Sequence, residues 1–248
     1  MRLLTDLVPT EPAWGLAIEE VLLDSARKER VETIRIWQNQ HAIILGRAQS
    51  LAAEVDVARA LEQDIPILRR ISGGGTVFHY PGNLNVSVFA NKRSKTSDVA
   101  SVFTFFGQSL SNALASFLPV HVSCQDNGLY LDGKKIGGAA QARRGSAVLY
   151  HSTILVQPSP VPMEQLLRAM GPGYCASGIA SRPRAMTTLS EHVSRSIEPQ
   201  ELVQPIVHAL ACALGVGVRP GTLTAQEIEC AEQLKKTKYG SPTWNARM

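Results

Sequence analysis

The 248-residue sequence lacks a long hydrophobic run and has only four cysteines. No apolar stretch approaches the roughly 20 residues of a membrane span, and the first residues lack the apolar core of a secretion signal. The cysteines lie at positions 124, 175, 212 and 230 and form no CxxC pair, which argues against a zinc site. We therefore expect a cytoplasmic protein with free thiols and no membrane partner.

A strong charge of one sign is also absent. The net charge is +4, a mild excess that fits an anionic substrate or an acidic protein partner. The basic residues are dispersed, and no zinc-finger or RNP-type motif is present, so we expect no binding to nucleic acid.

The hydrophobic pattern predicts helices and strands in a mixed order. Helices are expected at 12–26, 55–62, 102–117, 163–170, 199–214 and 224–236. Strands are expected at 33–37, 42–45, 65–68, 76–78, 85–89, 129–131, 135–136 and 147–156. The strands come in consecutive pairs with helices between the groups, unlike the strict alternation of a doubly wound sheet. This order favours an α+β fold on a mixed, largely antiparallel sheet flanked by helices, and residues 1–248 are expected to form one domain.

A glycine-rich segment gives the first indication of function. Arg69 and Arg70 precede three consecutive glycines, Gly73–Gly75, between two strand-like runs. Glycine is costly inside a strand, so the segment predicts a turn where the backbone lies close to another group. Backbone N–H groups and arginine forks both suit phosphate or carboxylate oxygens. A plain hairpin turn flanked by surface arginines explains the same residues equally well.

Three further segments are each ambiguous alone. His79 is followed by a Pro-Gly-Asn turn in which Asn83 either binds a ligand or caps the turn. Lys135 stands beside a Gly-Gly step, either as a point charge in a site or as a solvated hairpin lysine. His151 lies within a strand, either as a general base or in a structural role.

Read in order, these segments resemble the lipoate–protein ligase A family of the biotin/lipoate ligase superfamily. The matching segments are Gly46–Gln49 with Glu54, Arg69–His79 with Gly82-Asn83, Asp132–Ala139, His151–Leu155 and Lys238–Asn245. The last looks like the family's KY-x-S-x-x-W-N segment. The resemblance runs from the helix at Pro12 to Asn245, which is nearly the whole chain.

The resemblance implies a catalytic domain related to class II aminoacyl-tRNA synthetases and a reaction in two steps. Lipoate or octanoate attacks the α-phosphate of ATP to give acyl-AMP, and a lysine of a lipoyl domain or H-protein-like carrier then takes the acyl group. Mg²⁺ would offset the pyrophosphate charge, although the sequence identifies no metal ligand. The implied catalytic residue is Lys135. The implied substrate- and nucleotide-binding residues are Arg47, Arg70, Ser72, Gly73, Gly74, Gly75, Thr76, Val77, Phe78, His79, Gly82, Asn83, Gly137, Gly138, Ala139, His151 and Thr153.

The chain also departs from the family pattern. Many members carry Asp after the motif His, where this chain has Tyr80-Pro81, and Asn-Asp before the lysine, where it has Asn127-Gly128. They often carry His-His-Gly-Thr where this chain has the segment 150–153. Longer ligases continue into a C-terminal accessory domain that we do not expect in this chain. If adenylation needs that domain, a separate subunit must supply it; otherwise the chain is a compact single-chain form.

Two alternatives stay open at this point. An octanoyltransferase of the same superfamily takes octanoate from acyl carrier protein through a cysteine thioester, and Cys175 in a Gly-rich loop is the candidate nucleophile. A loop cysteine without a role is the favoured explanation of the same residue. A non-catalytic lipoyl-protein assembly subunit would keep the fold, but it would have no need of Lys135. The intact Gly73–Gly75 favours the ATP-using ligase.

Overall fold

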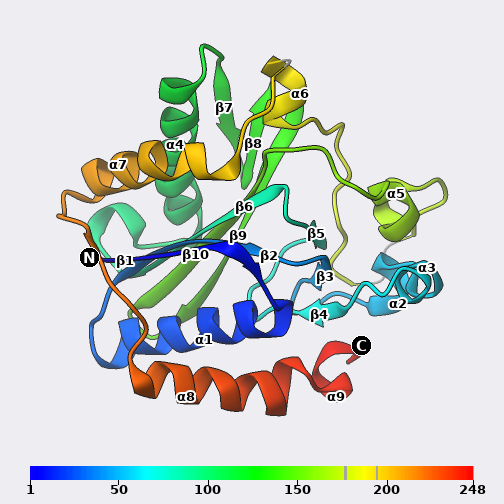
Figure 1. Cartoon of the computed structure of the whole chain (residues 1–248), viewed down its shortest axis with the longest axis horizontal. Helices are drawn as coiled ribbons and strands as arrows, with labels where there is room; N and C mark the ends of the chain where they lie inside the picture. The colour runs from blue at the N-terminus through cyan, green and yellow to red at the C-terminus, as the bar shows by residue number, and fades with distance from the viewer. Residues whose placement is uncertain (176–177, 194, 248) are drawn as a thin grey trace.

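An eight-stranded sheet runs through the middle of the part of the chain that the computed structural model describes, residues 1–175, 178–193 and 195–247 without the Ser94 side chain (Figure 1). The strand order is β11-β1-β2-β6-β10-β9-β8-β7. The strands are β1 (Arg2–Thr10), β2 (Thr33–Asn39), β6 (Asn83–Asn91), β7 (Val122–Gln125), β8 (Gly128–Leu131), β9 (Lys134–Arg144), β10 (Ala147–Leu155) and β11 (Arg219–Pro220). All neighbours from β2 to β7 pair antiparallel, whereas β1 pairs parallel with β2 and β11.

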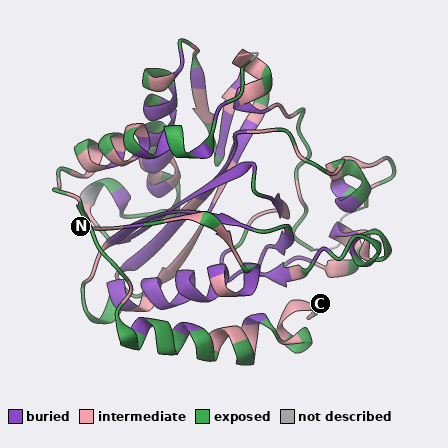
Figure 2. Ribbon diagram, viewed as in Figure 1, coloured by how far each residue is buried: buried purple, intermediate pink, exposed green. Residues whose placement is uncertain are grey.

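Helices cover both faces of this sheet. On one face lie α1 (Pro12–Lys28) and α8 (Ala225–Leu234), and on the other lie α4 (Val99–Phe117) and α7 (Val203–Leu214). Each pair of helices encloses its own hydrophobic core against the sheet. Figure 2 shows the buried residues on the sheet and on the inner sides of these helices, which is the arrangement that an apolar helical stripe requires.

A second, three-stranded sheet of the described residues has the order β4-β3-β5 and lies beside the first. Its strands are β3 (Ala42–Leu45), β4 (Ile67–Arg69) and β5 (Val77–His79). The chain before and after the glycines therefore does not form a hairpin, because β4 and β5 pair with opposite edges of β3. The hairpin interpretation is wrong: the glycine segment crosses from one edge of β3 to the other.

Shorter elements complete the described part of the chain. The α-helices are α2 (Leu51–Glu54), α3 (Val57–Glu62), α5 (Met163–Leu166), α6 (Leu189–Val193) and α9 (Pro242–Asn245). Single turns of other helix types are η1 (Ser94–Thr96), η2 (Arg168–Met170), η3 (Pro199–Leu202) and η4 (Lys235–Tyr239). No helix of the described residues is both long and apolar enough to span a membrane.

The expected mixed, largely antiparallel sheet flanked by helices is confirmed. The pattern missed β1, β7, β11 and α6, and β9 continues to Arg144 well beyond the expected hairpin. Pro9 and a register shift between Asp6 and Thr10 interrupt the alternation of β1, so its sequence does not look like a strand. The helix expected at 55–62 begins only at Val57, with α2 before it, because Asp56 caps α3 by accepting from the Arg59 N–H.

The turns and helix caps predicted from the sequence are present in the structure. Asp132 and Gly133 both have positive φ, 45° and 75°, as a tight hairpin turn between β8 and β9 requires. Thr224 caps α8 in a box with Glu227. Gly215 ends α7 in the left-handed conformation.

Candidate active site

A cavity of about 400 Å³ lies where the small sheet meets β9 and β10 of the large one. Its size is typical of a small-molecule site. Residues 70–76, called the glycine loop below, form one wall, and β9 with the segment 179–186 forms another. The lining includes the expected Arg70, Gly74, Gly75, Thr76, Val77, Phe78, His79, Lys135, Gly137, Gly138, Ala139, His151 and Thr153.

The glycine loop is held from within by Arg70. Its guanidinium donates to the carbonyls of Ile44, Gly73 and Gly75 and to the Ser72 hydroxyl. Burial lowers the pKa of Arg70 to about 10, so it stays charged at neutral pH. Because these bonds occupy most of its N–H groups, Arg70 holds the loop carbonyls and fixes the shape of the loop.

Arg69 fastens the loop to a distant part of the chain. It is fully buried and donates to the carbonyls of Gly46 and Gln49 on one side and of Asn245 and Arg247 on the other. The side chain of Asn245 in turn accepts from the Arg69 N–H at 2.9 Å.

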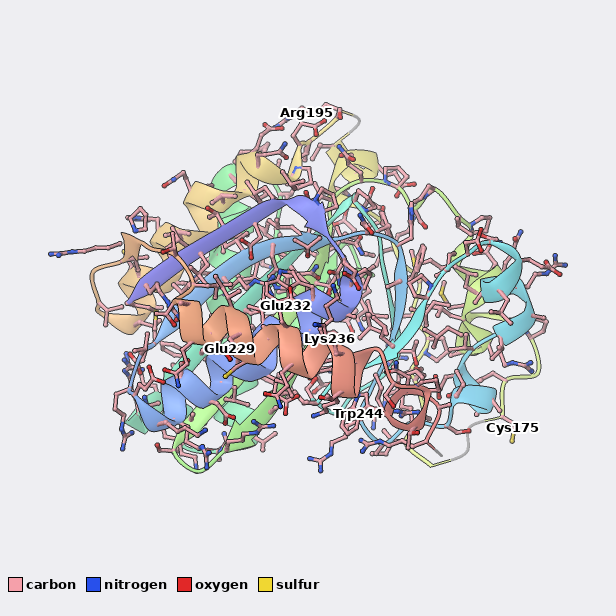
Figure 3. The ribbon with its side chains drawn as sticks, turned by 60° about the horizontal axis from the view of Figure 1, so that its bottom comes forward. Cys175, Arg195, Glu229, Glu232, Lys236 and Trp244 are labelled. Atoms are coloured by element: carbon pink, nitrogen blue, oxygen red, sulfur yellow. The ribbon has the colours of Figure 1, made fainter. Side chains whose placement is uncertain are left out.

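Trp244 completes this contact, since its indole N–H donates to the Arg69 carbonyl at 2.7 Å. The Lys238 ammonium and the Arg247 guanidinium lie over the Trp244 ring, 4.0 and 3.6 Å from its centroid. Figure 3 shows Trp244 near the C-terminal turn that follows α8. The Trp-Asn pair, recognised as a sequence motif, is thus a structural support of the glycine loop.

Backbone contact explains the glycines at two positions. Gly74 has φ +82°, a conformation that side chains rarely adopt. A Cβ on Gly46 would lie 2.0 Å from the Gly74 carbonyl oxygen. The two glycines therefore allow the loop to lie directly on the chain after β3.

Lys135 lies on the opposite wall. Its ammonium would be 3.2 Å from a Cβ at Gly138, so the side chain lies along the glycine step of β9. Burial lowers the pKa of Lys135, and the nearby charge of Arg184 lowers it further. The ammonium makes no hydrogen bond or ion pair with any described residue and faces the cavity, where it is available to an anionic ligand.

His151 belongs to a chain of buried hydrogen bonds. Its Nδ1 lies 2.9 Å from the Glu19 carboxylate, and its Nε2 lies 2.7 Å from the Ser72 hydroxyl. Burial would raise the pKa of Glu19, but His151 and the Ser87 hydroxyl outweigh that effect and hold the pKa below its usual value. An ionised Glu19 therefore orients the imidazole toward the glycine loop.

His79 takes part in a second chain. Its Nδ1 lies 3.0 Å from the Asn39 amide nitrogen, and its Nε2 lies 3.0 Å from the Thr153 hydroxyl. Burial lowers the pKa of His79 to about 3, so the ring is neutral. A neutral, fully hydrogen-bonded histidine orders the cavity wall and carries no charge to a ligand.

The segment 179–186 is the main functional element that the sequence did not reveal. The backbone of Lys135 exchanges hydrogen bonds with Ala185 and Thr187, which ties the segment to β9. The Ser181 hydroxyl donates to the buried Glu54 and accepts from the Thr76 N–H, which ties the segment to the glycine loop. Arg182 and Arg184 could have indicated this segment in the sequence, because two cations so close together outside the family motifs suit an anionic ligand. Both line the cavity.

Six expected residues do not line the cavity. Ser72 lies directly behind it, bonded to His151, and Asn83 is buried with its amide donating to the Phe78 carbonyl. The carbonyl of Gly82 accepts from Val156 and Gln157 in the turn before β6. Gly73 and Arg47 are exposed. Cys175 lines a separate hollow, and in Figure 3 its side chain points outward.

The described residues form no cluster of three or more His, Cys, Asp or Glu suited to a metal ion. The two carboxylates that line the cavity, Glu19 and Glu54, are already bonded to His151 and Ser181. The described part of the chain therefore offers no dedicated Mg²⁺ cage, and Mg²⁺ fits here only as a counterion carried by nucleotide phosphates.

Comparison with known proteins agrees with this geometry. Residues 11–211 match the model of the lipoyl protein ligase A/B catalytic domain. The chain belongs to this family. The match covers α1, the strands from β2 to β10 and the residues that line the cavity, so the resemblance to the family is confirmed.

Members of the family differ in their named activities. The chain is 26% identical to lipoate-protein ligase A subunit 1 of Thermoplasma acidophilum, over 98% of this chain and 95% of that protein. It is 29% identical to octanoyltransferase LipM of Symbiobacterium thermophilum, over 94% of this chain and 93% of that protein. A crystal structure of lipoate-protein ligase A bound with ATP superposes with a TM-score of 0.81 at 25% identity, covering 99% of each chain. Both ligases and octanoyltransferases are therefore among its relatives.

Proposed function

We propose that this family member is an ATP-dependent lipoate–protein ligase. It joins lipoate or octanoate to ATP as acyl-AMP and passes the acyl group to a lysine of a lipoyl domain or an H-protein-like carrier. The observation that carries the proposal is the Lys135 ammonium, which faces a cavity that no cysteine of the described chain lines. An adenylating enzyme requires such a cation, and a thioester-forming enzyme requires a cysteine there.

In the first step a carboxylate oxygen of the fatty acid attacks the α-phosphorus of ATP. The new bond joins the acyl oxygen to phosphorus, and the bond to the β-phosphate breaks to release pyrophosphate. Negative charge gathers on the phosphate oxygens in the transition state, where Lys135 and Arg184 stabilise it. Arg70 holds the glycine loop in shape on the opposite side.

In the second step the amine of the acceptor lysine attacks the acyl carbonyl. An amide bond forms, AMP leaves, and a proton is released. The acceptor must reach the cavity from solvent, and the segment 179–186, which includes the half-exposed Ile179, lies at this opening. A protein substrate is consistent with apolar surface at the mouth.

A second polypeptide is part of the proposal. The similarity to a protein named subunit 1 of a lipoate-protein ligase supports a catalytic subunit that works with a separate accessory chain. Residues 1–248 would then act as one catalytic domain.

The competing activity is an octanoyltransferase, which the similarity to LipM favours. It would use a cysteine thioester in place of ATP. Cys175 lies in a hollow formed by Ala52, Asp56 and Tyr174 and not in the main cavity. Burial raises the pKa of the half-buried Cys124 thiol, with the Asp126 charge adding to this effect, which makes a poor nucleophile.

One experiment separates the two activities. The purified chain is incubated with lipoate, MgCl₂ and α-labelled ATP, alone and with a polypeptide that carries the accessory domain. We expect labelled lipoyl-AMP in at least one of the two mixtures. Absence of adenylate in both, together with an octanoyl thioester trapped on any of the four cysteines after incubation with octanoyl carrier protein, would rule out the ligase.

A further inference from the structure

Asn85 on β6 carries an unpaired hydrogen-bond donor at the cavity. The side chain is only 2% exposed, and its amide nitrogen has no hydrogen-bond partner among the described residues. Asn85 is also one of the residues that line the cavity. A buried donor without a partner costs roughly 1–3 kcal/mol, so its retention points to a partner that the chain itself does not supply.

The neighbouring hydrogen bonds fix which way the amide faces. The Asn39 amide donates to Nδ1 of His79, whose neutral ring therefore carries its proton on Nε2. That proton goes to the Thr153 hydroxyl, and the hydroxyl donates to Oδ1 of Asn85 at 2.8 Å. With its oxygen occupied in this way, Asn85 presents its NH₂ group as the free end of the chain.

The position of Asn85 relative to Lys135 follows from the register of the sheet. Asn85 pairs with Thr153 on β10, and Thr153 pairs with Gly138 on β9, over which the Lys135 ammonium lies. Two strand spacings, about 10 Å, therefore separate Asn85 from the lysine. Trp37 pairs with Asn85 on the far side and also lines the cavity.

Resting on the proposed function, we propose that the Asn85 amide selects a lipoyl chain by donating a hydrogen bond to a sulfur of its ring. With its carboxylate at Lys135, an extended eight-carbon chain that crosses β10 and β6 ends about 10 Å away, beside Asn85 and Trp37. Lipoate carries its two sulfurs at that end. Octanoate carries only methylene and methyl groups there, which would leave the buried amide unpaired.

The expected selectivity is modest because sulfur is a weak acceptor. Against this, the amide has no other partner among the described residues, and the Trp37 ring adds a favourable contact to sulfur. We expect the protein to bind lipoate about tenfold more tightly than octanoate, the lower end of what one buried hydrogen bond discriminates.

The test measures binding of lipoate and of octanoate to the full chain by titration calorimetry without ATP. Asn85→Leu, which is close in volume and removes the donor, should bring the two affinities within a factor of about two. Asn85→Ala is the second variant in case the leucine perturbs folding. Asn112→Leu makes the same change at an exposed position on α4 and should keep the wild-type ratio.

Two results would overturn the inference: equal affinity of the wild type for the two acids, or an unchanged ratio in both Asn85 variants. Either result would mean that the Asn85 amide donates to a water molecule or to nothing, and not to the lipoyl ring. Because binding is measured without ATP, these results are independent of whether the chain forms an adenylate. A chain that prefers lipoate through Asn85 but forms no lipoyl-AMP would keep this inference and refute the ligase.

Discussion

The two walls of the cavity use their cations differently. On the glycine-loop wall, Arg69 and Arg70 are buried, and their N–H groups bond to backbone carbonyls. On the lysine wall, Lys135 and Arg184 line the cavity, and the Lys135 ammonium has no partner among the described residues. The arginines next to the glycines in sequence therefore hold the loop in place, whereas Lys135, far away in sequence, faces the cavity without a partner among the described residues. Proximity to a glycine motif does not by itself identify the group that binds an anion.

The strongest test of this contrast is removal of the lysine. Lys135→Ala should reduce acyl-adenylate formation about 100- to 1,000-fold, since one preorganised donor to a developing oxyanion has this effect. The unfolding temperature should change little, because the ammonium has no partner in the described structure to lose. Lys134→Ala, the exposed neighbour on the same strand, is the matched control and should keep full activity. Full activity of Lys135→Ala would refute the proposal that the Lys135 ammonium stabilises the developing charge.

On the glycine-loop wall the opposite result is expected. Arg69→Met should lower the free energy of unfolding by about 3 kcal/mol, because it leaves several buried carbonyls without donors. Denaturant unfolding measures this change. Arg59→Met removes only an exposed pair with Glu62 and should cost less than about 1 kcal/mol. Equal effects of the two substitutions would mean that Arg69 is not a structural clamp.

Contact between the glycine loop and the chain after β3 can be tested with a single methyl group. Gly46→Ala places a Cβ against the Gly74 carbonyl and should cost about 2 kcal/mol of stability, as overpacking of a core does. Gly217→Ala is the control, since a Cβ there meets nothing within 4 Å. The unfolding temperature of Gly46→Ala should therefore be clearly lower than that of Gly217→Ala. Equal unfolding temperatures would contradict the close contact between Gly46 and the Gly74 carbonyl.

The smallest expected effect concerns pH. Burial would raise the pKa of Glu20, but hydrogen bonds from Lys238, Tyr239 and Arg144 outweigh it and hold the pKa below its ordinary value. A depressed folded-state pKa stabilises the protein above the unfolded value, near 4.3, and this stability is lost as pH falls through the folded value. Wild-type stability should thus decline below about pH 4.5, and Glu20→Gln should show a shallower decline over the same range. Parallel pH profiles would exclude Glu20 as the linked group.

The sequence predicted the elements whose cause is local, but not the contacts that join them. The α1 helix, the hairpin at Asp132-Gly133 and the cap at Thr224 follow from periodicity and turn chemistry, and the structure confirms them. The course of the glycine segment could not be read in this way, because a hairpin and a crossover over β3 require the same residue types.

The site residues also fall into those that a local sequence pattern predicted and those that depend on contacts between distant segments. The motif residues with a charge or a glycine step, such as Lys135 and Gly138, were predicted, and the structure brings them together at the cavity. Asn85 was missed because a single Asn in an apolar strand has no distinguishing pattern. Its significance depends on the directions of hydrogen bonds through His79 and Thr153, which only coordinates reveal.

The contact between Arg69 and Asn245 also constrains when the site can form. The two residues are 176 positions apart, so the loop cannot be fastened while the ribosome is still making the chain between them. Synthesis proceeds at about 5–20 residues per second. Asn245 therefore emerges about ten seconds or more after Arg69, and until then the hydrogen bonds between them cannot form. A nascent chain can therefore build β3 and β4 early and still lack the contacts that hold the glycine loop in place.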